Sequence, residues 1–486
     1  MSLLVTRTNI RLNPDYKKVI PRFFNTGNER SLLIINSVIE MKEADAKKLL
    51  DTTLDDFSSH YKNIQQIFLK HFNLIKYLIP EAEKNGLTEN KKLLLGSYFT
   101  MEYSIEAAAL FNPSIIEDPD QLGAGVNEKK VIVSFRATGE SHISSLIFKQ
   151  GLLDENGMIY FEKPGKFISE GVITEQIKDN KLAFKNVLSQ MSLPKKLTTN
   201  IVNQLHDQFS YKEMELVLKN TLQNIEPDTE RKRIKYNILS KVNTSYELHF
   251  SADSLLSERI IFPVTSTEKN GIEDARFVKF TEEDGTFFYI GTYTAYDGTF
   301  ITPQLIITDD FCHFKIRPLH GKAAVNKNLA LFPRRINGQY AMISRIDGMN
   351  NYLMFSDDLY MWDDATLLQQ PKYPWEFIQV GNAGSPIETE KGWLIITHGV
   401  GAMRKYCLGA SLFDLNEPMI ELGRLKEPFL IPNEDERDGY VPNVVYSCGS
   451  IIHNGKLVIP YAVSDYASSF ATVQLDELLN EILNSK

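Results

Sequence analysis

Residues Arg276–Phe300 read RFVKFTEEDGTFFYIGTYTAYDGTF, two apolar and aromatic runs separated by the polar turn Glu-Glu-Asp-Gly at 282–285. A turn of this kind between two such runs is typical of a β-hairpin. The same texture extends from Ser245 to about Gln474 and recurs in three clear stretches. These are 331–345 (LFPRRINGQYAMISR), 389–400 (TEKGWLIITHGV) and 450–463 (SIIHNGKLVIPYAV). Repeated strand–turn–strand units suit a sandwich or a β-propeller and favour the propeller, although periodicity alone does not give the number of blades.

Strands are also predicted upstream, after Pro113, where short apolar alternations are bounded by turn residues. These stretches are 130–139 (KVIVSFRATG), 144–157 (SSLIFKQGLLDENG) and 158–165 (MIYFEKPG). The chain therefore has β-texture on both sides of a different segment, residues 174–241.

Two parts of the chain show helical spacing of apolar residues, from about Glu29 to Ala108 and from about Thr174 to Lys241. We expect the last helix of the first part to run over 91–110 (KKLLLGSYFTMEYSIEAAAL), until Asn112-Pro113 stops it. The sequence predicts a mainly β protein with an N-terminal helical region and a helical insertion. The expected domains are 1–107 (helical), 108–172 with 245–486 (β domain) and 173–244 (insertion).

The composition is that of a globular protein, with 43% hydrophobic and 11% aromatic residues among 486. A formal net charge of −9 argues against nucleic acid or an anionic membrane as a partner, because both reward clustered Lys and Arg. Cys312, Cys407 and Cys448 have neither the spacing of a zinc site nor the density of a disulfide scaffold.

Several sequence signals that would direct the interpretation elsewhere are absent from the sequence. We find no signal-peptide core and no apolar run of membrane-spanning length. A Walker loop, a strand-linked GxGxxG and HExxH are also missing. We expect a cytoplasmic protein that needs no metal and no organic cofactor.

The segment Gly271–Arg276 (GIEDAR) places two acids and an arginine just before an apolar strand. Taken alone it predicts a charged surface turn, because charge clusters usually lie in water. Since side chains alternate along a strand, we expect Glu273 and Asp274 to point to opposite sides. A carboxyl group that gives up a proton near neutrality also needs a raised pKa, which burial or a neighbouring negative charge supplies.

Other motifs accompany GIEDAR in a definite order along the chain. They are NPSI (112–115), SFRATGE (134–140), YTAYDG (293–298), NKNLALFPRRINGQY (326–340), SR (344–345), GWLIITHGVGAMRKYCLGA (392–410) and PYAVSD (460–465). Together these motifs resemble the signature of glycoside hydrolase family 130, over roughly residues 108–170 and 245–475. The resemblance implies a five-bladed β-propeller that cleaves β-mannosides with phosphate and releases α-mannose 1-phosphate with inversion.

The resemblance also assigns roles, with Asp274 as the catalytic acid. Cations, an imidazole and hydroxyls attract a phosphate dianion, and amides, carboxylates and arginines pair with sugar hydroxyls. The implied phosphate-binding residues are Lys327, Asn328, Arg345, His398 and Tyr406, with Arg404 as an additional candidate. The implied substrate-binding residues are Asn112, Arg136, Asp297 and Asp465, with Tyr293 or Tyr296 as an aromatic wall.

Two positions keep an inverting β-mannosidase open as an alternative. Gln379 stands where many phosphate-using relatives carry a basic residue, and Glu388 lies just beyond it. A glutamate there could activate water as a general base. A non-catalytic carbohydrate-binding propeller is a further alternative.

The segment RATGESHISS at 136–145, with His142, is typical of the longer family members that carry an N-terminal helical region. Resemblance to these members favours β-1,2-mannosides over β-1,4-mannosides. The expected partners are a β-mannooligosaccharide and inorganic phosphate as co-substrate. The apolar stripe of the N-terminal helices favours a homo-oligomer, although packing against the side of the β domain would bury the stripe equally well.

Overall fold

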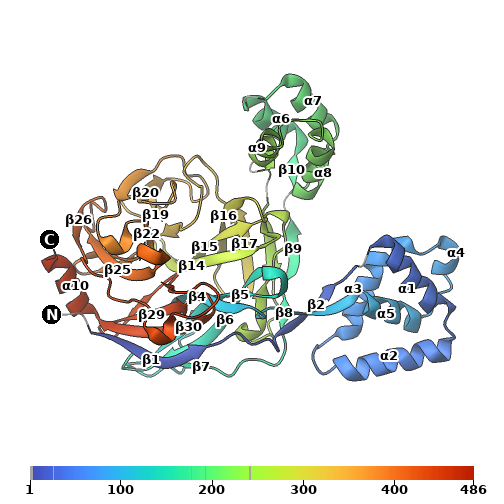
Figure 1. Cartoon of the computed structure of the whole chain (residues 1–486), viewed down its shortest axis with the longest axis horizontal. Helices are drawn as coiled ribbons and strands as arrows, with labels where there is room; N and C mark the ends of the chain where they lie inside the picture. Colours follow the sequence, from blue (N-terminus) through green and yellow to red (C-terminus); the bar gives the residue numbers. More distant parts are fainter. Residues whose placement is uncertain are drawn as a thin grey trace. The chain divides into compact units, whose positions relative to one another are not determined.

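The structure is a computed structural model that describes residues 4–25, 27–176, 178–191, 193–239, 242 and 244–485. The chain forms two compact units (Figure 1). Unit 1 consists of Met1–Pro14, Ala108–Lys163 and Glu170–Lys486, and unit 2 consists of Asp15–Ala107 and Pro164–Ser169.

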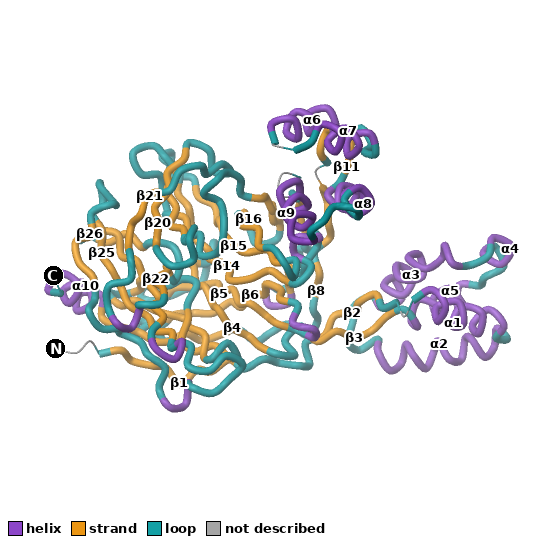
Figure 2. Tube along the Cα trace, turned by 45° about the horizontal axis from the view of Figure 1, so that its top comes forward, coloured by secondary structure: helices purple, strands orange, loops and turns teal. Residues whose placement is uncertain are grey.

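Unit 2 is a small helical body with one antiparallel pair of strands; helices are purple in Figure 2. Its elements are α1 (Asn28–Glu40), α2 (Glu43–Phe57), α3 (Ile64–Ile75), α4 (Glu81–Lys84), α5 (Glu89–Tyr98), β2 (Val19–Phe23) and β3 (Thr100–Ser104). A Cβ on Gly96 of α5 would lie 1.9 Å from the carbonyl oxygen of Phe68 on α3. The glycine therefore lets the two helices pack with their backbones in contact.

The helix expected over 91–110 is wrong in its second half. The helix α5 ends at Tyr98, and the next residues form β3, which pairs with β2 from Val19↔Ser104 to Phe23↔Thr100. The segment Thr-Met-Glu-Tyr-Ser at 100–104 contains β-favouring Thr and Tyr, and pairing with a neighbouring strand decides between the two conformations.

A second group of helices belongs to unit 1 and follows β9. It comprises α6 (Lys181–Gln190), α7 (Lys195–Asn203), α8 (Tyr211–Thr221) and α9 (Asp228–Leu239), with the short pair β10 (Asp179–Asn180) and β11 (Gln208–Phe209). These helices share a core of their own, in which Phe209, Met214, Leu218 and Ile238 are fully buried.

The largest sheet of unit 1 has twelve strands. Nine strands follow the order β4 (Ala109–Glu117), β5 (Lys129–Thr138), β6 (Ser144–Leu153), β14 (Gly271–Thr281), β15 (Phe287–Tyr296), β16 (Ile301–Thr308), β17 (His313–Pro318), β12 (Tyr246–His249) and β9 (Val172–Gln176). The other three are β7 (Ile159–Phe161), β8 (Ser169–Glu170) and β13 (Arg259–Ile261).

Three smaller sheets complete unit 1. The first contains β18 (Ala330–Leu331), β19 (Tyr340–Ser344), β20 (Asn351–Ser356) and β21 (Thr366–Gln369). The second contains β22 (Gln379–Asn382), β23 (Ile387–Thr389), β24 (Gly392–Val400), β25 (Tyr406–Phe413) and β26 (Glu421–Arg424). The third contains β27 (Val445–Tyr446), β28 (Ile451–His453), β29 (Lys456–Val463), β30 (Ala467–Gln474) and β1 (Val5–Leu12), and is followed by α10 (Leu475–Asn484).

These pairings confirm the predicted strands, and Arg276–Phe300 forms most of β14 and all of β15, joined as a hairpin. They establish a mainly β protein. Among the described residues, the sheet pairings do not close into a ring, so the five-bladed propeller stays a prediction.

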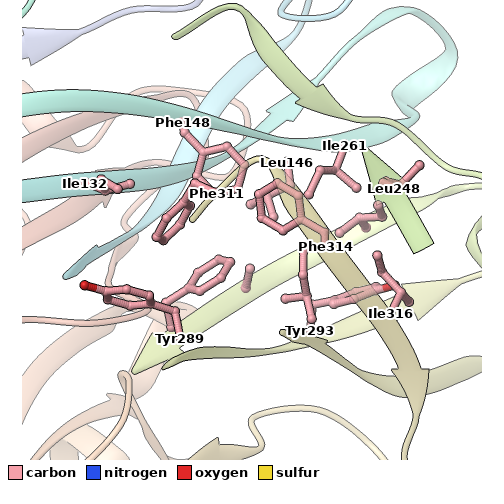
Figure 3. Packing of buried hydrophobic residues seen from close by; sticks show 14 of the residues in the cluster. Ile132, Leu146, Phe148, Leu248, Ile261, Tyr289, Tyr293, Phe311, Phe314 and Ile316 are labelled. Carbon is pink, nitrogen blue, oxygen red and sulfur yellow. The ribbon is translucent and has the colours of Figure 1, made fainter. Parts of the chain in front are cut away.

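Aromatic side chains fill the core of the large sheet (Figure 3). Phe148 stacks on Phe314, with ring centroids 5.8 Å apart, and meets Phe311 edge to face at 5.7 Å. Such pairs contribute beyond the apolar area that they bury. Tyr289 and Tyr293 extend this core from β15.

A fully buried carboxyl group, Glu268, fixes the turn that leads into β14. It accepts hydrogen bonds from the hydroxyls of Tyr246 at 2.9 Å and Tyr293 at 2.5 Å. It also accepts from the backbone N–H groups of Val264 and Thr265, both at 3.0 Å. This network holds the start of β14 to the aromatic core.

We predict that Glu268→Ala lowers the free energy of unfolding of unit 1 by about 3–5 kcal/mol, because two buried hydroxyls and two partly buried backbone N–H groups lose their acceptor. Urea unfolding followed by circular dichroism measures the loss. The matched variant Glu268→Gln keeps one carbonyl oxygen and should lose less. Equal losses in the two variants would contradict this account of the network.

Candidate active site

A cavity of about 260 Å³ gathers most of the predicted site residues. It contains every one of them except Asp297 and the two aromatic candidates Tyr293 and Tyr296, together with Gln379 and Tyr446. Its lining is Asn112, Arg136, Asp274, Lys327, Asn328, Arg345, Gln379, His398, Arg404, Tyr406, Val441, Val444, Tyr446 and Asp465. The cavity is therefore strongly polar and carries charges of both signs.

Asp274 enters this cavity from a β-bulge. The register of β14 against β15 shifts between Glu273 and Arg276, where Asp274 and Ala275 stand opposite a single residue. Asp274 has a φ of 56°, in the left-handed region that a non-glycine residue rarely adopts. A bulge re-aims the side chains beside it, and here it directs the Asp274 carboxylate to the cavity.

The bulge overturns the expected alternation of Glu273 and Asp274. Arg136 donates from Nη2 to Glu273 Oε1 at 2.6 Å and from Nη1 to Asp274 Oδ1 at 3.2 Å, so one guanidinium meets both carboxylates. Glu273 also accepts from Lys327 Nζ at 2.7 Å. Glu273 is thus paired with two cations and does not line the cavity, whereas Asp274 does.

The pKa of Asp274 also differs from the raised value that a proton donor near neutrality needs. Burial raises the pKa of this carboxyl group, but the charges of Arg136, Lys327 and Arg276 outweigh burial and lower the pKa to about 2. Asn112 Nδ2 donates to Asp274 Oδ1 at 2.6 Å and further stabilises the ionised form. In this site the pKa of Asp274 is lowered and not raised, so Asp274 is a carboxylate at neutral pH.

Asp465 is the second carboxyl group of the cavity, and its pKa moves in the opposite direction. Burial and the negative charge of Asp274 raise the pKa of Asp465 to about 6, although Arg136 and Arg404 oppose the shift. Two interacting carboxyl groups whose environments push their pKa values apart differ in proton occupancy near neutral pH.

His398 and Arg345 form a buried pair on the cationic side of the cavity. The backbone carbonyl of Asn382 lies 3.0 Å from His398 Nδ1 and can only accept, so Nδ1 carries the proton. His398 Nε2 therefore accepts from Arg345 Nη1 at 3.3 Å and from Gln379 Nε2 at 3.4 Å. Burial, Arg345 and Arg276 lower the pKa of His398 well below its usual value, so the imidazole is neutral.

Arg345 has spare capacity for hydrogen bonds. Its Nε is buried and has no hydrogen-bond partner among the residues that the structure describes. Burial lowers the pKa of Arg345, which shows that desolvation outweighs the nearby negative groups. An anion in the cavity would accept a hydrogen bond from this Nε and compensate for the lost hydration of the Arg345 charge.

A hydrogen-bond hub centred on Arg276 connects the segments around the cavity. Its fully buried guanidinium donates to the Asp274 carbonyl at 2.8 Å and to Asn382 Oδ1 at 3.2 Å. It also donates to the hydroxyl of Tyr446 at 2.5 Å, which in turn accepts from Asn328 Nδ2 at 3.2 Å. Neither Arg276 nor Tyr446 was assigned a role from the sequence. In the sequence, the position of charged Arg276 among the apolar residues of β14 could have indicated its role. No sequence signal indicated a role for Tyr446.

Among the described residues, no group of three or more His, Cys, Asp or Glu side chains is placed to hold a metal ion. Within the same part of the chain, every helix is too short or too polar to cross a membrane.

Comparison with known proteins identifies the family. A family model described as beta-1,4-mannooligosaccharide phosphorylase matches residues 230–484, more than half of the chain. The chain belongs to glycoside hydrolase family 130.

The family 130 relatives include enzymes that act on β-1,2-linked mannosides. A 1,2-beta-oligomannan phosphorylase from Thermoanaerobacter sp. (strain X514) is 34% identical over 243 residues, or 47% of this chain and 78% of the relative. A Beta-1,2-mannobiose phosphorylase from Listeria innocua serovar 6a is 31% identical over 241 residues, or 48% of this chain and 65% of the relative. A solved structure of the Listeria innocua Beta-1,2-Mannobiose phosphorylase with beta-1,2-mannobiose matches with a TM-score of 0.46 and 21% identity, over 77% of this chain and 92% of that chain.

Two residues to which the family 130 motifs assign substrate-binding roles lie outside the cavity. Tyr293 points into the aromatic core and donates to Glu268, because its position opposite the bulge faces the interior of the sheet. Asp297 closes the next turn, where its Oδ1 accepts from the backbone N–H groups of Thr299 at 2.7 Å and Phe300 at 2.6 Å. The structure thus corrects the substrate-binding assignment of both residues. Tyr296, the other aromatic candidate, is likewise absent from the lining.

Glu388, the candidate base of a family 130 hydrolase, also lies elsewhere. It lines a different cavity and accepts two hydrogen bonds from Arg334, at 2.7 and 2.8 Å. Gln379 does line the site, where it contacts His398 instead of providing a charge.

We predict that Asp465→Asn stabilises the protein at pH 8 but not at pH 4. Because the folded-state pKa of about 6 exceeds the ordinary 3.8, the folded protein retains a proton that the unfolded chain has lost, and stability falls as pH rises between these values. Above pH 7 the ionised group costs on the order of 1–3 kcal/mol, which Asn removes. Thermal unfolding across this pH range measures the difference. Asp297→Asn is the control, and a gain that does not depend on pH would contradict the assignment.

Proposed function

We propose that this protein phosphorolyses short β-mannosides with inversion, releases α-mannose 1-phosphate, and prefers β-1,2 to β-1,4 linkages. The relatives that act on 1,2-β-linked oligomannan and mannobiose support the substrate class and the linkage. The reaction is reversible, so the same site would build oligosaccharides from the sugar phosphate.

The observation that carries the proposal is the charge around Asp274. Besides Arg136, which is paired with Asp274 itself, three cationic side chains line the same small cavity: Lys327, Arg345 and Arg404. A phosphate dianion is attracted by such donors, and Arg in particular offers paired N–H groups to its oxygens. The unpaired Nε of Arg345 adds a donor that is already desolvated.

Hydrolysis would instead require a carboxylate that activates water on the face of the sugar opposite the acid. Glu388 was the candidate for this role, and its ion pair with Arg334 in another cavity argues against it. The cationic set therefore favours phosphate over water as the nucleophile.

In the proposed reaction, a phosphate oxygen attacks C1 of the mannosyl residue while the bond from C1 to the glycosidic oxygen breaks on the opposite face. The leaving oxygen takes a proton whose source is the Asp274 carboxyl group, directly or through a hydroxyl of the mannosyl residue. Because Asp274 is ionised at neutral pH, it must gain that proton when the site is loaded. Bound phosphate favours this gain, since its negative charge offsets the cations that lower the pKa.

Architecture and assembly form part of the same proposal. We propose a five-bladed propeller whose blades begin at β4, β14, β18, β22 and β27, with β1 completing the last blade. The isolated parallel bridges Ser114↔Gly449, His320↔Met361 and Tyr406↔Val444 support adjacent placement of different sheets. We also propose a cytoplasmic homo-oligomer without a resident cofactor, in which exposed apolar residues of unit 2 such as Leu33 and Tyr77 make the contact.

We predict that release of mannose 1-phosphate from β-1,2-mannobiose requires inorganic phosphate, and that Asp274→Asn lowers turnover by about 10²–10⁴-fold. Chromatography of the products, with and without phosphate, tests the first part. β-1,4-Mannobiose in parallel tests the linkage. Release of free mannose at a rate that phosphate does not change would establish a hydrolase. Sugar binding without turnover on either substrate would indicate a non-catalytic carbohydrate-binding protein.

We predict that sulfate, a dianion that does not titrate near neutrality, binds with uptake of a fraction of a proton at pH 6.5. A negative charge in the cavity raises the pKa of Asp465 above about 6, so more of this group becomes protonated. Calorimetry in buffers of different ionisation enthalpy measures the uptake. In Asp465→Asn the uptake should decrease to the part that Asp274 contributes, while sulfate still binds. Proton release in the wild-type protein would contradict the prediction.

A further inference from the structure

A second cavity of unit 1 is larger than the active-site cavity, with a volume of about 640 Å³. We call it the remote cavity, because it shares no lining residue with the cavity of Asp274. It is lined by Phe287, Phe288, Ile307, Thr308, Asp309, His313, Lys315, Arg335, Tyr340, Asp357, Asp358, Leu359 and Tyr360. The walls come from β15, β16 and β17 and from β19 and the turn after β20.

Aromatic side chains of the remote cavity remain open to water. Phe287 is 42% exposed and Tyr360 is 38% exposed, so both rings can contact a ligand in the cavity. Lys279 Nζ lies over the Phe287 ring, 4.3 Å from its centroid, but Lys279 does not line the remote cavity. Phe287 thus offers the cavity a ring that its neighbours cover only in part.

Carboxylates stand next to these rings with free hydrogen-bonding capacity. Asp357 Oδ1 accepts from Gln339 Nε2 at 3.0 Å, and Asp358 Oδ1 accepts from the Tyr360 backbone N–H at 2.9 Å. Among the described residues, the second oxygen of each has no hydrogen-bond partner, and the Asp309 carboxylate has none at all.

The turn that carries Tyr360 is fixed by its own hydrogen bonds. Ser356 Oγ donates to the Met361 carbonyl at 2.6 Å and accepts from the Asp358 N–H at 3.1 Å. The backbone carbonyl of Tyr360 also accepts from the His320 N–H at 2.8 Å. The backbone that carries Tyr360 and Asp358 is therefore fixed before any ligand binds, which lowers the entropic cost of binding.

The remote cavity lies at the opposite end of the β14–β15 hairpin from the active site. Phe287 pairs with Thr281, seven residues along β14 from Asp274. At about 3.3 Å per residue this separation is roughly 20 Å. A ligand in the remote cavity is therefore too far from Asp274 to take part in bond cleavage.

We propose that the remote cavity binds a chain of sugar residues as a non-catalytic site. One face of a hexopyranose carries C–H groups that pack on aromatic rings, whose faces are electron-rich. Its hydroxyls donate to carboxylates, and Asp309, Asp357 and Asp358 supply free acceptor oxygens. The three carboxylates outnumber the cationic Lys315 and Arg335 of the lining, and Arg335 is already paired with Glu282, so a neutral polyhydroxylated ligand fits this cavity better than an anion.

The choice of a mannose chain as the ligand rests on the proposed function. A remote site for the same polymer would keep chains near the enzyme and raise their local concentration at the active site. It would act on chains long enough to occupy it, and would leave the turnover of a disaccharide unchanged.

Calorimetric titration of the phosphate-free Asp274→Asn protein with β-1,2-mannotetraose, and separately with β-1,4-mannotetraose, tests the proposal. We expect two binding events per chain with at least one of these sugars. Adding Phe287→Ala and Tyr360→Ala should weaken the second event about tenfold or more, because two stacking rings are lost. Adding Phe287→Tyr and Tyr360→Phe instead keeps the rings and should preserve it.

Tyr160→Ala is the matched control, because Tyr160 is 60% exposed and lines neither cavity. Thermal unfolding checks that each variant is folded. A single binding event in every protein, or an equal loss in Tyr160→Ala, would overturn the proposal. So would a change in oligomeric state of the Phe287→Ala/Tyr360→Ala protein with unchanged sugar binding, since the surface would then be a protein contact.

Failure of the remote site and failure of the proposed function give different results. The Phe287→Ala/Tyr360→Ala protein that keeps Asp274 should phosphorolyse β-1,2-mannobiose within about twofold of the wild-type rate, because the disaccharide needs only the active site. Loss of the second binding event with normal phosphorolysis supports both. Normal phosphorolysis with no second event rejects the remote site alone.

Discussion

The buried charge of Arg276 is the constraint on which the active site depends. A guanidinium without water must have its donors satisfied, and here the acceptors come from three separate segments: Asp274, Asn382 and Tyr446. These contacts fix the carbonyl of the bulged residue and the amide of a strand in a different sheet. The Arg276 side chain therefore fixes the segments that form the cavity, although Arg276 itself does not line it.

The two carboxyl groups of the cavity have pKa values shifted in opposite directions, although both lie in the same electrostatic field. Asp274 accepts a hydrogen bond from Arg136 and is ionised, and its charge in turn makes ionisation of Asp465 costly. Proton occupancy is thus a property of the pair and not of either residue alone. Any anion that enters this field changes both members at once, which couples the charge of the co-substrate to the supply of protons.

The sequence predicted those features that depend on local pattern. Polar turns between apolar runs located the hairpins, and the order of motifs located most of the cavity lining. The predictions that failed concern features that depend on tertiary contacts. The alternation argument misplaced Glu273, because a bulge breaks the period of two, and the helix expected to continue past Tyr98 gave way to pairing of β3 with β2. Tyr293 was misassigned because an aromatic residue in a strand reads the same whether it faces a ligand or the core.

The pairing of β1 with β30 has a consequence for how the chain is made. Val5 lies opposite Val473, so the two paired strands are 468 positions apart in the chain and β30 is synthesised long after β1. At typical elongation rates the interval is on the order of half a minute or more. Throughout that time Val5–Leu12 is an unpaired strand, open to pairing with other chains. Unit 2, whose core draws mainly on residues 19–99, can close long before. Nascent chains therefore carry a folded helical body while the β unit still awaits its last strand, which makes this interval the period of greatest exposure to misassembly.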